Sequence, residues 1–410
     1  MHARSSLRPL RVLRTLALPA ALAFASAAPA QDQRPTGYPR SANERTGRPV
    51  SLSAVHTGEV RGVVSGGIAR GARYLDNLDL QVALDADRLI GWRGARLFLY
   101  GIYDNGRGLS RTLVGDVQGI SNIETRARAA RLFEAGVEQD VGRHASIRAG
   151  LYNLNAEFDT TQSGGLFLIS SHGIGPDYAQ SGRNGPSIFP VTSLAVRGEV
   201  ALGRNVLVRA AVLDGVPGDP AHPKRTAIRL SRRDGALLAG EVDWLAGGTK
   251  IGIGGWAYTA RFDALGATGS GRRGNKGGYV YAEHRFAGTR ADDPAGLAAW
   301  LRLGLAETRF NAIGDYAGGG VVYTGLLPGR DRDQAGLSFA AAGLGGRFRR
   351  AGAVAGRAIG RREVVLEAAY QAVLTPWLSL QPDAQYVIRP GGDRRRGNAV
   401  VLGLRMKVGR

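Results

Sequence analysis

The sequence predicts an all-β fold: a transmembrane antiparallel β-barrel of about 16 strands, with short periplasmic turns and long outer loops. Three observations lead to this prediction. The chain begins with an export signal, it contains many stretches in which apolar and polar residues alternate, and the connections between these stretches are alternately short and long. Alternation over about ten residues is typical of a strand that crosses a bilayer within a barrel wall.

The N-terminus predicts the compartment. Several arginines precede a short apolar core, Leu16–Ala25, and the small residues of Ala28–Ala30 form a cleavage site. This pattern predicts a secretory signal peptide over residues 1–30. A transmembrane helix does not fit, because the apolar core is much shorter than the roughly 20 residues that a bilayer requires. The polar residues 31–57 predict a flexible leader before a barrel domain that spans 58–410.

Alternation with a period of two then recurs along the chain. In one such stretch, Leu78, Leu80 and Val82 alternate with Asp79 and Gln81. The predicted strands are 59–68, 77–88, 95–104, 130–140, 145–155, 193–201, 206–213, 236–245, 250–260, 278–287, 299–309, 320–326, 335–342, 363–373, 377–388 and 399–408. Their polar members would face a water-filled lumen, among them Glu134, Glu138, Arg209, Glu241, Asp243, Glu367 and Gln371.

The connections distinguish a membrane barrel from a soluble β-sandwich, which would also alternate. Connections after even-numbered strands are mostly tight, as at 142–144 and 203–205. Those after odd-numbered strands include the long segments 105–129, 156–192 and 343–362. Short connections after even-numbered strands and long ones after odd-numbered strands are typical of barrels with short periplasmic turns and long outer loops. The same order places both termini in the periplasm. The wall must close, because hydrocarbon offers no partner to a free strand edge.

The five tryptophans lie mostly near strand ends. They are Trp92, Trp244, Trp256, Trp300 and Trp377. Tryptophan is enriched where a membrane protein meets the bilayer interface, so this placement predicts an aromatic belt, with ordinary packing as the alternative.

Composition limits the classes of partner. The 410 residues carry a formal charge of +20 and no cysteine, so the exported protein would have no disulfide. The basic excess is consistent with an anionic partner such as lipopolysaccharide phosphate, with a pore lining, or with an arginine bias spread over a solvated surface. A nucleic-acid partner is not expected, because the chain is exported and has no clustered basic run.

Catalytic motifs are weak or missing in the sequence. Gly252–Ala257 fits the dinucleotide pattern G-x-G-x-x-A, but it lies inside an alternating strand rather than between a strand and a helix. There is no G-x-S-x-G, H-E-x-x-H or P-loop motif, and the histidines are too scattered for metal-ligand spacing. We therefore expect no enzyme activity, no cofactor and no metal.

Several motifs together resemble the OprB-type carbohydrate-selective porins. They occur in order along most of the chain, at Tyr103–Gly106, Leu113–Glu124, Gly150–Asp159, Ser171–Asp177, Asn184–Pro190, Val212–Pro220 and Leu374–Asp383. The resemblance implies a sixteen-stranded barrel of the outer membrane that passes sugars, with long loops folded inward to narrow the pore.

The function expected from this resemblance is passive, sugar-selective diffusion of monosaccharides and small carbohydrates into the periplasm. A general or anion-leaning porin is the first alternative, and a secreted β-rich carbohydrate-binding protein is the second. The expected partners are small carbohydrates and the lipid or lipopolysaccharide of the outer membrane. The oligomeric state, monomer or trimer, stays open.

Two loops, 105–129 and 156–192, are the candidates for a pore constriction. The second contains Gly164–Pro190, which is too rich in glycine and proline for a regular element and too apolar for a solvated linker. Guanidinium and carboxylate groups would bind sugar hydroxyls, and an aromatic ring would stack on a sugar face. The candidate residues are Arg107, Arg111, Glu124, Asp159, Asp177, Tyr178 and Arg183. The alternative is that these are solvated loop charges or form salt bridges between loop and wall.

Overall fold

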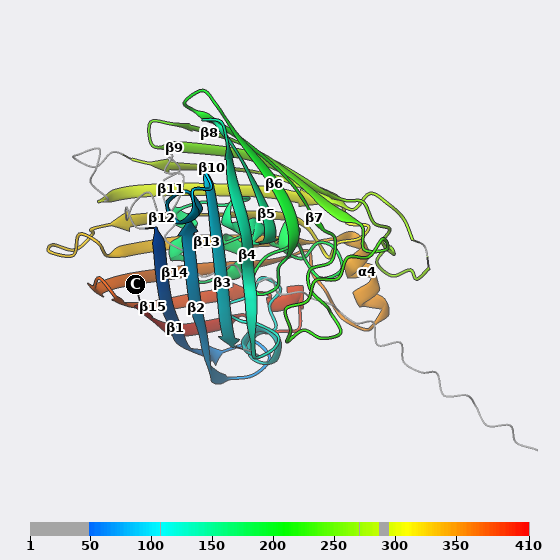
Figure 1. Cartoon of the computed structure of the whole chain (residues 1–410). Coiled ribbons are helices and arrows are strands. Elements are labelled where there is room, and N and C mark those ends of the chain that lie inside the picture. The colour runs from blue at the N-terminus through cyan, green and yellow to red at the C-terminus, as the bar shows by residue number, and fades with distance from the viewer. Residues whose placement is uncertain (1–48, 107, 270, 287–294, 410) are drawn as a thin grey trace, which may run out of the picture.

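The computed structural model describes residues 49–106, 108–269, 271–286 and 295–409, and these form a closed antiparallel β-barrel of sixteen strands. Neighbouring strands of the wall follow one another in chain order, and β1 pairs with β16 (Figure 1). The predicted signal peptide 1–30 and most of the predicted leader 31–57 lie outside the described residues. The predicted fold class is confirmed.

All sixteen predicted strands are present. They are β1 Val50–Ser65, β2 Gly71–Asp85, β3 Ala95–Asn105, β4 Ala129–Val141, β5 Ala145–Tyr152, β6 Ser193–Leu202, β7 Val206–Asp214, β8 Ala236–Ala246, β9 Thr249–Tyr258, β10 Lys276–Arg285, β11 Gly296–Ala306, β12 Ile313–Thr324, β13 Gln334–Leu344, β14 Arg362–Thr375, β15 Leu378–Ile388 and β16 Ala399–Gly409.

Three of the predicted strand starts were wrong by several residues, those of β1, β2 and β12. β2 begins at Gly71 rather than 77. β1 begins at Val50, so residues 50–57 belong to the wall and not to the predicted leader 31–57. In this segment Val50, Leu52 and Ala54 alternate with serines, and pairing with β2 begins at its first residue and supplies backbone hydrogen bonds along its length. β12 begins at Ile313 rather than 320, because Gly318–Gly320 interrupts the apolar alternation from which the start was predicted.

The side chains show which face of the wall is which. In the pair of strands that closes the barrel, Val60 lies opposite Leu404 and Glu59 lies opposite Arg405. Val60 and Leu404 are exposed on the outside, whereas Glu59 and Arg405 are buried in the interior. This alternation is the one expected of a wall with lipid on its outer face and polar groups on its inner face.

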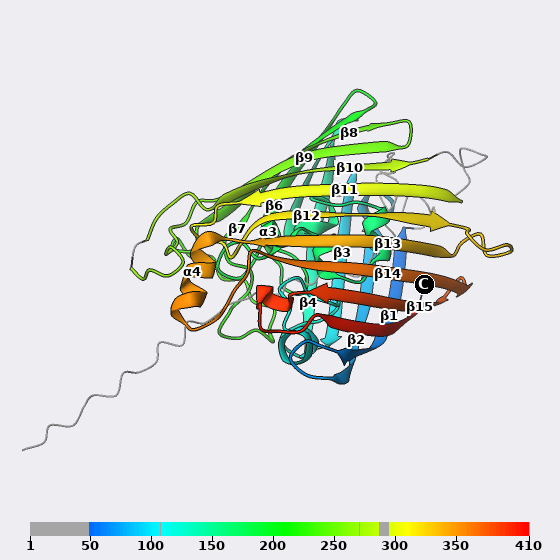
Figure 2. The ribbon, with the colours of Figure 1, turned by 180° about the vertical axis from the view of Figure 1, so that it is seen from behind.

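Short turns occupy one end of the barrel and long loops the other. The short turns after even-numbered strands include 142–144, 203–205, 247–248 and 376–377, and the long loops after odd-numbered strands include 106–128, 153–192, 215–235, 259–275 and 345–361. The chain's last strand ends among the short turns, at the opposite end from α4 (Figures 1 and 2). The long loops are therefore the outer ones.

Helical segments are short and lie in the connections. They are α2 Ala86–Ile90, η1 Ser110–Val114, η2 Leu154–Ala156, η3 Ser163–Leu166, η4 Ser170–His172, α3 Pro176–Ala179, α4 Gly346–Val354 and η5 Pro390–Gly392. Among the described residues, no helix has the length and apolar character needed to cross a bilayer.

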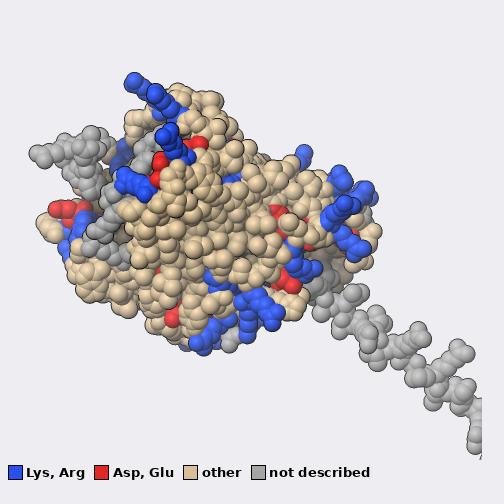
Figure 3. All heavy atoms as spheres, viewed as in Figure 1, with Lys and Arg blue, Asp and Glu red and all other residues tan. Residues whose placement is uncertain are grey.

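The tryptophans divide into two groups. Trp92, Trp244 and Trp377 are exposed and lie at or beside the short turns, as an interfacial belt requires. Trp256 and Trp300 are instead buried inside the barrel, where they contact loop 153–192, so the predicted belt is wrong for these two. Basic and acidic groups gather toward both ends of the visible face, and a broad band without them lies between (Figure 3).

Candidate functional site

Loop 153–192, between β5 and β6, folds into the barrel. Its aromatic and aliphatic side chains are buried, and several of them belong to a cluster with inward-facing residues of β8 to β11. Tyr178 stacks on Trp256 with ring centroids 5.1 Å apart and ring planes within 5°. Pro176 begins the short helix α3, where its fixed φ suits the first helical position, and this helix carries Tyr178 to the wall. The loop's apolar residues therefore bind it to the inside of the wall.

Carboxylates of the wall accept hydrogen bonds from backbone N–H groups of this loop. Glu283 on β10 accepts from Gln162, at 2.8 Å, and from Ser163. Glu367 on β14 accepts from the consecutive N–H groups of Leu168 and Ile169, the latter at 3.1 Å. Because these N–H groups have no partner in a helix or sheet, the carboxylates satisfy donors that burial would otherwise leave unpaired.

A buried arginine of β11 ties two further points of the loop together. Arg302 donates to both carboxylate oxygens of Asp159, at 3.1 and 2.7 Å, and to Asp177. Asp159 has a φ of 55°, a left-handed conformation that is uncommon outside glycine and is held here by its contacts with the wall. Burial raises the pKa of Asp177, and the guanidinium of Arg302 opposes that increase. The two carboxylates and Arg302 thus form one compensated cluster.

His172 of η4 bridges the loop to two other strands. Its Nδ1 lies 3.0 Å from the Tyr316 hydroxyl on β12, and its Nε2 lies 3.0 Å from the Ser338 hydroxyl on β13. Burial lowers the pKa of His172 to about 3, so the ring is neutral at physiological pH.

Loop 106–128, between β3 and β4, packs beside loop 153–192. Asn122 N–H donates to Leu168 carbonyl at 2.8 Å, and Ser170 N–H donates to Gly119 carbonyl at 2.8 Å. Polar side chains of the neighbouring wall bind it from behind, for example Gln385 on β15, which donates to Ile120 carbonyl at 3.0 Å. The two loops together cover the wall from β11 through β16 to β2, where polar side chains such as those of Arg61 and Asp383 are fully buried.

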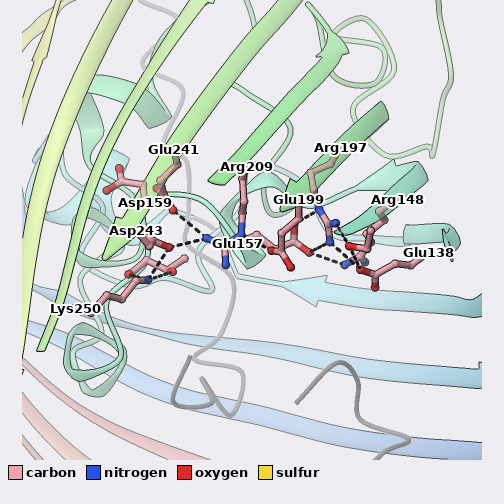
Figure 4. Close-up of polar contacts among 12 residues, drawn as sticks. Glu138, Arg148, Glu157, Asp159, Arg197, Glu199, Arg209, Glu241, Asp243 and Lys250 are labelled. Atoms are coloured by element: carbon pink, nitrogen blue, oxygen red, sulfur yellow. Dashed lines mark hydrogen bonds and ion pairs between the residues drawn. The ribbon is translucent and has the colours of Figure 1, made fainter. Parts of the chain in front are cut away.

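The opposite wall, from β3 to β9, carries a row of ion pairs that the loops cover only in part; Figure 4 shows most of its members. Each arginine of the row lies within 4 Å of at least two carboxylates. The arginines are Arg96, Arg148, Arg197 and Arg209, and the carboxylates are Glu134, Glu138, Asp140, Glu157, Glu199, Glu241 and Asp243. Six members keep between 14% and 24% of the side chain exposed, namely Arg96, Glu138, Asp140, Arg148, Glu157 and Glu199. We call these eleven residues, together with Lys250, which lies 3.8 Å from Asp243, the ion-pair row.

Glu157 is the member of the ion-pair row that belongs to loop 153–192. It accepts from Arg197 at 2.6 Å and from the Tyr152 hydroxyl at 2.6 Å, and it lies 3.4 Å from Arg148. Burial opposes its ionisation, but Arg197 and Arg148 outweigh that effect and hold the pKa of Glu157 well below its usual range. The carboxylate is therefore ionised at any physiological pH, and the loop contributes a fixed negative charge to the row.

Comparison with known proteins assigns the chain to a protein family. The family model described as "Carbohydrate-selective porin, OprB family" matches residues 69–409. The chain belongs to this porin family. It is 23% identical over 397 residues to Porin B of Pseudomonas aeruginosa, an alignment that covers 86% of each chain. It is a sugar-selective channel of the outer membrane, which excludes the secreted binding protein as an alternative.

Solved porin structures share the fold. The high pH structure of Pseudomonas putida OprB superposes with a TM-score of 0.78 at 20% identity and covers 90% of this porin and 96% of that chain. The low pH structure of the same protein gives a TM-score of 0.56 at 16% identity, with 90% and 98% covered. A mutant of the Rh. blastica porin gives 0.53 at 10% identity, with 88% and 100% covered. The family and fold are those of channels rather than enzymes.

The residues predicted to line the pore fall into a buried group and an exposed group in this porin. Glu124, Asp159, Asp177 and Tyr178 are at most 7% exposed and contact only loop and wall, which corrects their predicted contact with solute. Contacts within the protein hold all four. Glu124 accepts from the Ser110 N–H at 3.1 Å within its own loop, and the other three contact side chains of β9 to β11.

The two remaining predicted arginines that the structure describes are exposed in the outer loops. Arg111 lies on η1, and Arg183 pairs with Asp234 of the β7–β8 loop at 2.9 Å. Arg107 lies outside the described residues.

The ion-pair row was only partly recognised from the sequence. Glu134, Glu138, Arg209, Glu241 and Asp243 were predicted to face the lumen, and burial inside the barrel agrees with that for the most enclosed of them. Arg96, Arg148, Arg197 and Glu199 were missed. The available signal was a charge at an alternating strand position, which can only face the lumen because the other face of the strand meets lipid.

Proposed function

We propose that this porin passes monosaccharides and small neutral carbohydrates by passive diffusion along the ion-pair row. The observation that carries this proposal is the contrast between the two walls. On the side of β11 to β2 the polar groups are sealed beneath loops 106–128 and 153–192, whereas the ion-pair row keeps polar surface exposed to the lumen. A solute that follows the lumen past these loops meets the row.

The pairing within the row suits a neutral solute that carries many hydroxyl groups. A guanidinium has five N–H donors and a carboxylate has about four acceptor sites, so groups that already form an ion pair still have unused capacity for hydroxyls. Because every arginine of the row faces at least two carboxylates, the row offers no uncompensated positive charge to an anion. Its seven carboxylates against four arginines and Lys250 leave a small formal excess of two negative charges. Local donors and acceptors without a strong net charge favour sugars over salts.

The same pairing disfavours the anion-leaning alternative. Such a channel would need uncompensated basic groups along the lumen. The basic excess of +20 lies instead with arginines outside the row, such as Arg111, Arg225 and Arg232 in outer loops and Arg143 in a short turn, all of them exposed. We therefore retain Arg111 and Arg183 only as residues of the outer entrance, and assign pore narrowing to the two inward loops.

Replacement of Arg148 tests this path. Arg148→Gln removes a partly exposed guanidinium that lies 3.8 Å over the Phe98 ring and pairs with Glu134. Loss of one charge-assisted hydrogen bond of about 1.5–3 kcal/mol would weaken sugar binding roughly tenfold or more. The measurement is sugar-induced block of single-channel current, together with liposome swelling across a series of sugars.

The matched control is Arg143→Gln, which removes the same charge from an exposed turn. Sugar block should be unchanged in this variant. Reversal potentials in a salt gradient complete the test: strong anion preference in the unmodified porin, or equal sugar block in both variants, would contradict the proposal.

A further inference from the structure

A segment of the β7–β8 loop is attached to the rim of the wall. The Leu132 N–H donates to Thr226 Oγ1 at 2.8 Å, and the Thr226 hydroxyl donates to the Leu132 carbonyl at 3.2 Å. Arg131 donates to Pro223 carbonyl at 2.6 Å in the same region. β5 is short and pairs with β4 only from Ala135 onward, so the backbone of β4 around Leu132 has no strand beside it on that edge. The segment 223–233 therefore covers an open edge at the outer end of the barrel.

This segment exposes both cations and apolar side chains. Lys224, Arg225, Arg232 and Arg233 are exposed, and no described carboxylate lies within ion-pair distance of any of the four. Between them, Ile228 is 55% exposed and Leu230 is 72% exposed. The nearby acids are already engaged, since Asp219 pairs with Arg229 and His222, and Asp234 pairs with Arg183.

The position of the segment indicates what these groups meet. The side chain of Leu132, to whose backbone the segment is bound, is exposed on the outer, lipid-facing side of the wall. The long-loop end of the barrel is the outer one, so the segment lies at the height of the outer leaflet's headgroups. Unpaired guanidinium groups favour phosphate, and exposed aliphatic side chains beside them favour hydrocarbon. One molecule of that leaflet that offers both is a phosphorylated glycolipid.

We propose that segment 223–233 is a docking surface for phosphorylated glycolipid of the outer leaflet, that is, lipopolysaccharide. Lys224, Arg225, Arg232 and Arg233 bind the phosphates, while Ile228 and Leu230 contact the acyl chains. The attachment of Thr226 to β4 holds the segment in place on the wall. This role is independent of the sugar path, because none of these side chains belongs to the ion-pair row.

Lipopolysaccharide binding by the detergent-solubilised full-length porin tests the proposal. The probe is purified rough-type lipopolysaccharide, compared with the same lipid after enzymatic removal of its phosphates. Replacing Lys224, Arg225, Arg232 and Arg233 together with glutamine should weaken binding by about fivefold per removed cation at low salt. The dephosphorylated lipid should bind both proteins equally weakly, and millimolar inorganic phosphate should not displace the intact lipid.

The matched control replaces three exposed arginines of the short turns, Arg93, Arg143 and Arg204, with glutamine. It removes a similar charge from the opposite end, so affinity should change less than twofold. Heat-modifiable migration and sugar-driven liposome swelling should be normal in both variants, which establishes that both barrels are folded.

A second variant tests position rather than charge. Thr226→Val keeps every cation but removes both hydrogen bonds to Leu132, so binding should weaken severalfold with no change in net charge. Equal losses in the loop and turn variants, or full retention of phosphate-dependent binding in the loop variant, would overturn the proposal. Unaltered affinity in Thr226→Val would overturn the role of the attachment to β4.

Discussion

Replacing Arg302 with methionine should release loop 153–192 from the β11 wall while leaving the barrel closed. The substitution keeps a long apolar side chain but leaves the carboxylates of Asp159 and Asp177 buried without their shared cation. Removing one partner of a buried ion pair costs about 3–5 kcal/mol, because the remaining charge is uncompensated. The strand ladders of the wall do not depend on this side chain.

The size of that cost predicts a measurable opening. An energy of about 3–5 kcal/mol shifts the equilibrium between the docked and undocked loop by a factor of about one hundred to several thousand. Single-channel recording should show larger or more variable conductance, and liposome swelling should show faster entry of larger sugars. Hydrogen exchange at the Asp159 and Leu168 amides, which donate to Glu241 and Glu367, should accelerate.

A triple variant separates lost charge balance from lost packing. Arg302→Met with Asp159→Asn and Asp177→Asn removes the cation and both anions, so no buried charge is left unpaired. It should recover most of the protection and the narrow conductance of the unmodified porin. If the single variant behaves like the unmodified protein, or if the triple variant is no better than the single one, the cluster does not hold the loop.

Further predictions concern the same two loops. Burial raises the pKa of Glu124 to about 7 and that of Asp116 to about 6. Docking of loop 106–128 should therefore be strongest below about pH 4 and weaken as the pH rises to about 7. Glu124→Gln should remove about 3 kcal/mol of this pH dependence, which hydrogen exchange measured at a series of pH values would show. His172→Ala should cost about 1–3 kcal/mol of docking, equally at pH 5 and pH 8 because the ring is neutral at both, measured by limited proteolysis of the loop. Tyr178→Ala should cost about 3–5 kcal/mol of docking and expose Trp256 to a fluorescence quencher; unchanged quenching would contradict the stacking role.

The fold could be predicted because a bilayer imposes a simple pattern. A wall strand must place apolar residues toward lipid, and closure leaves no free edge, so alternation and connection parity are enough to find the strands. The exceptions follow from the same reasoning. The start of β1 at Val50 alternates over only a few residues and directly follows the polar segment 31–49, so it was assigned to the leader, and the run of glycines at Gly318–Gly320 hides the first half of β12.

The interior of the barrel was predictable only at the level of segments. The mixture of proline, glycine and apolar residues in 164–190 indicated a packed loop, and the structure confirms that it packs inside the wall. How each part of the loop is held against the wall depends on partners far away in the sequence, such as Glu367, which accepts from the Leu168 N–H. No local pattern shows that Tyr178 would stack on Trp256, so Tyr178 was predicted to contact solute when it is in fact buried.

The carboxylates of the wall explain how one barrel can hold a rigid loop and still offer a nearly neutral path. A loop inside a wet lumen cannot rely on apolar contacts alone, because water competes for its backbone N–H groups. Glu283 and Glu367 satisfy two such groups each, and Glu241 satisfies one while also accepting from Tyr279 at 2.7 Å. Carboxylates used in this way are no longer exposed as negative charge in the lumen. The arginines of the ion-pair row are all paired with carboxylates, so the large basic excess of the chain lies outside the row, in exposed outer loops and short turns. In the proposals made above, that excess meets membrane headgroups while the row meets the sugar.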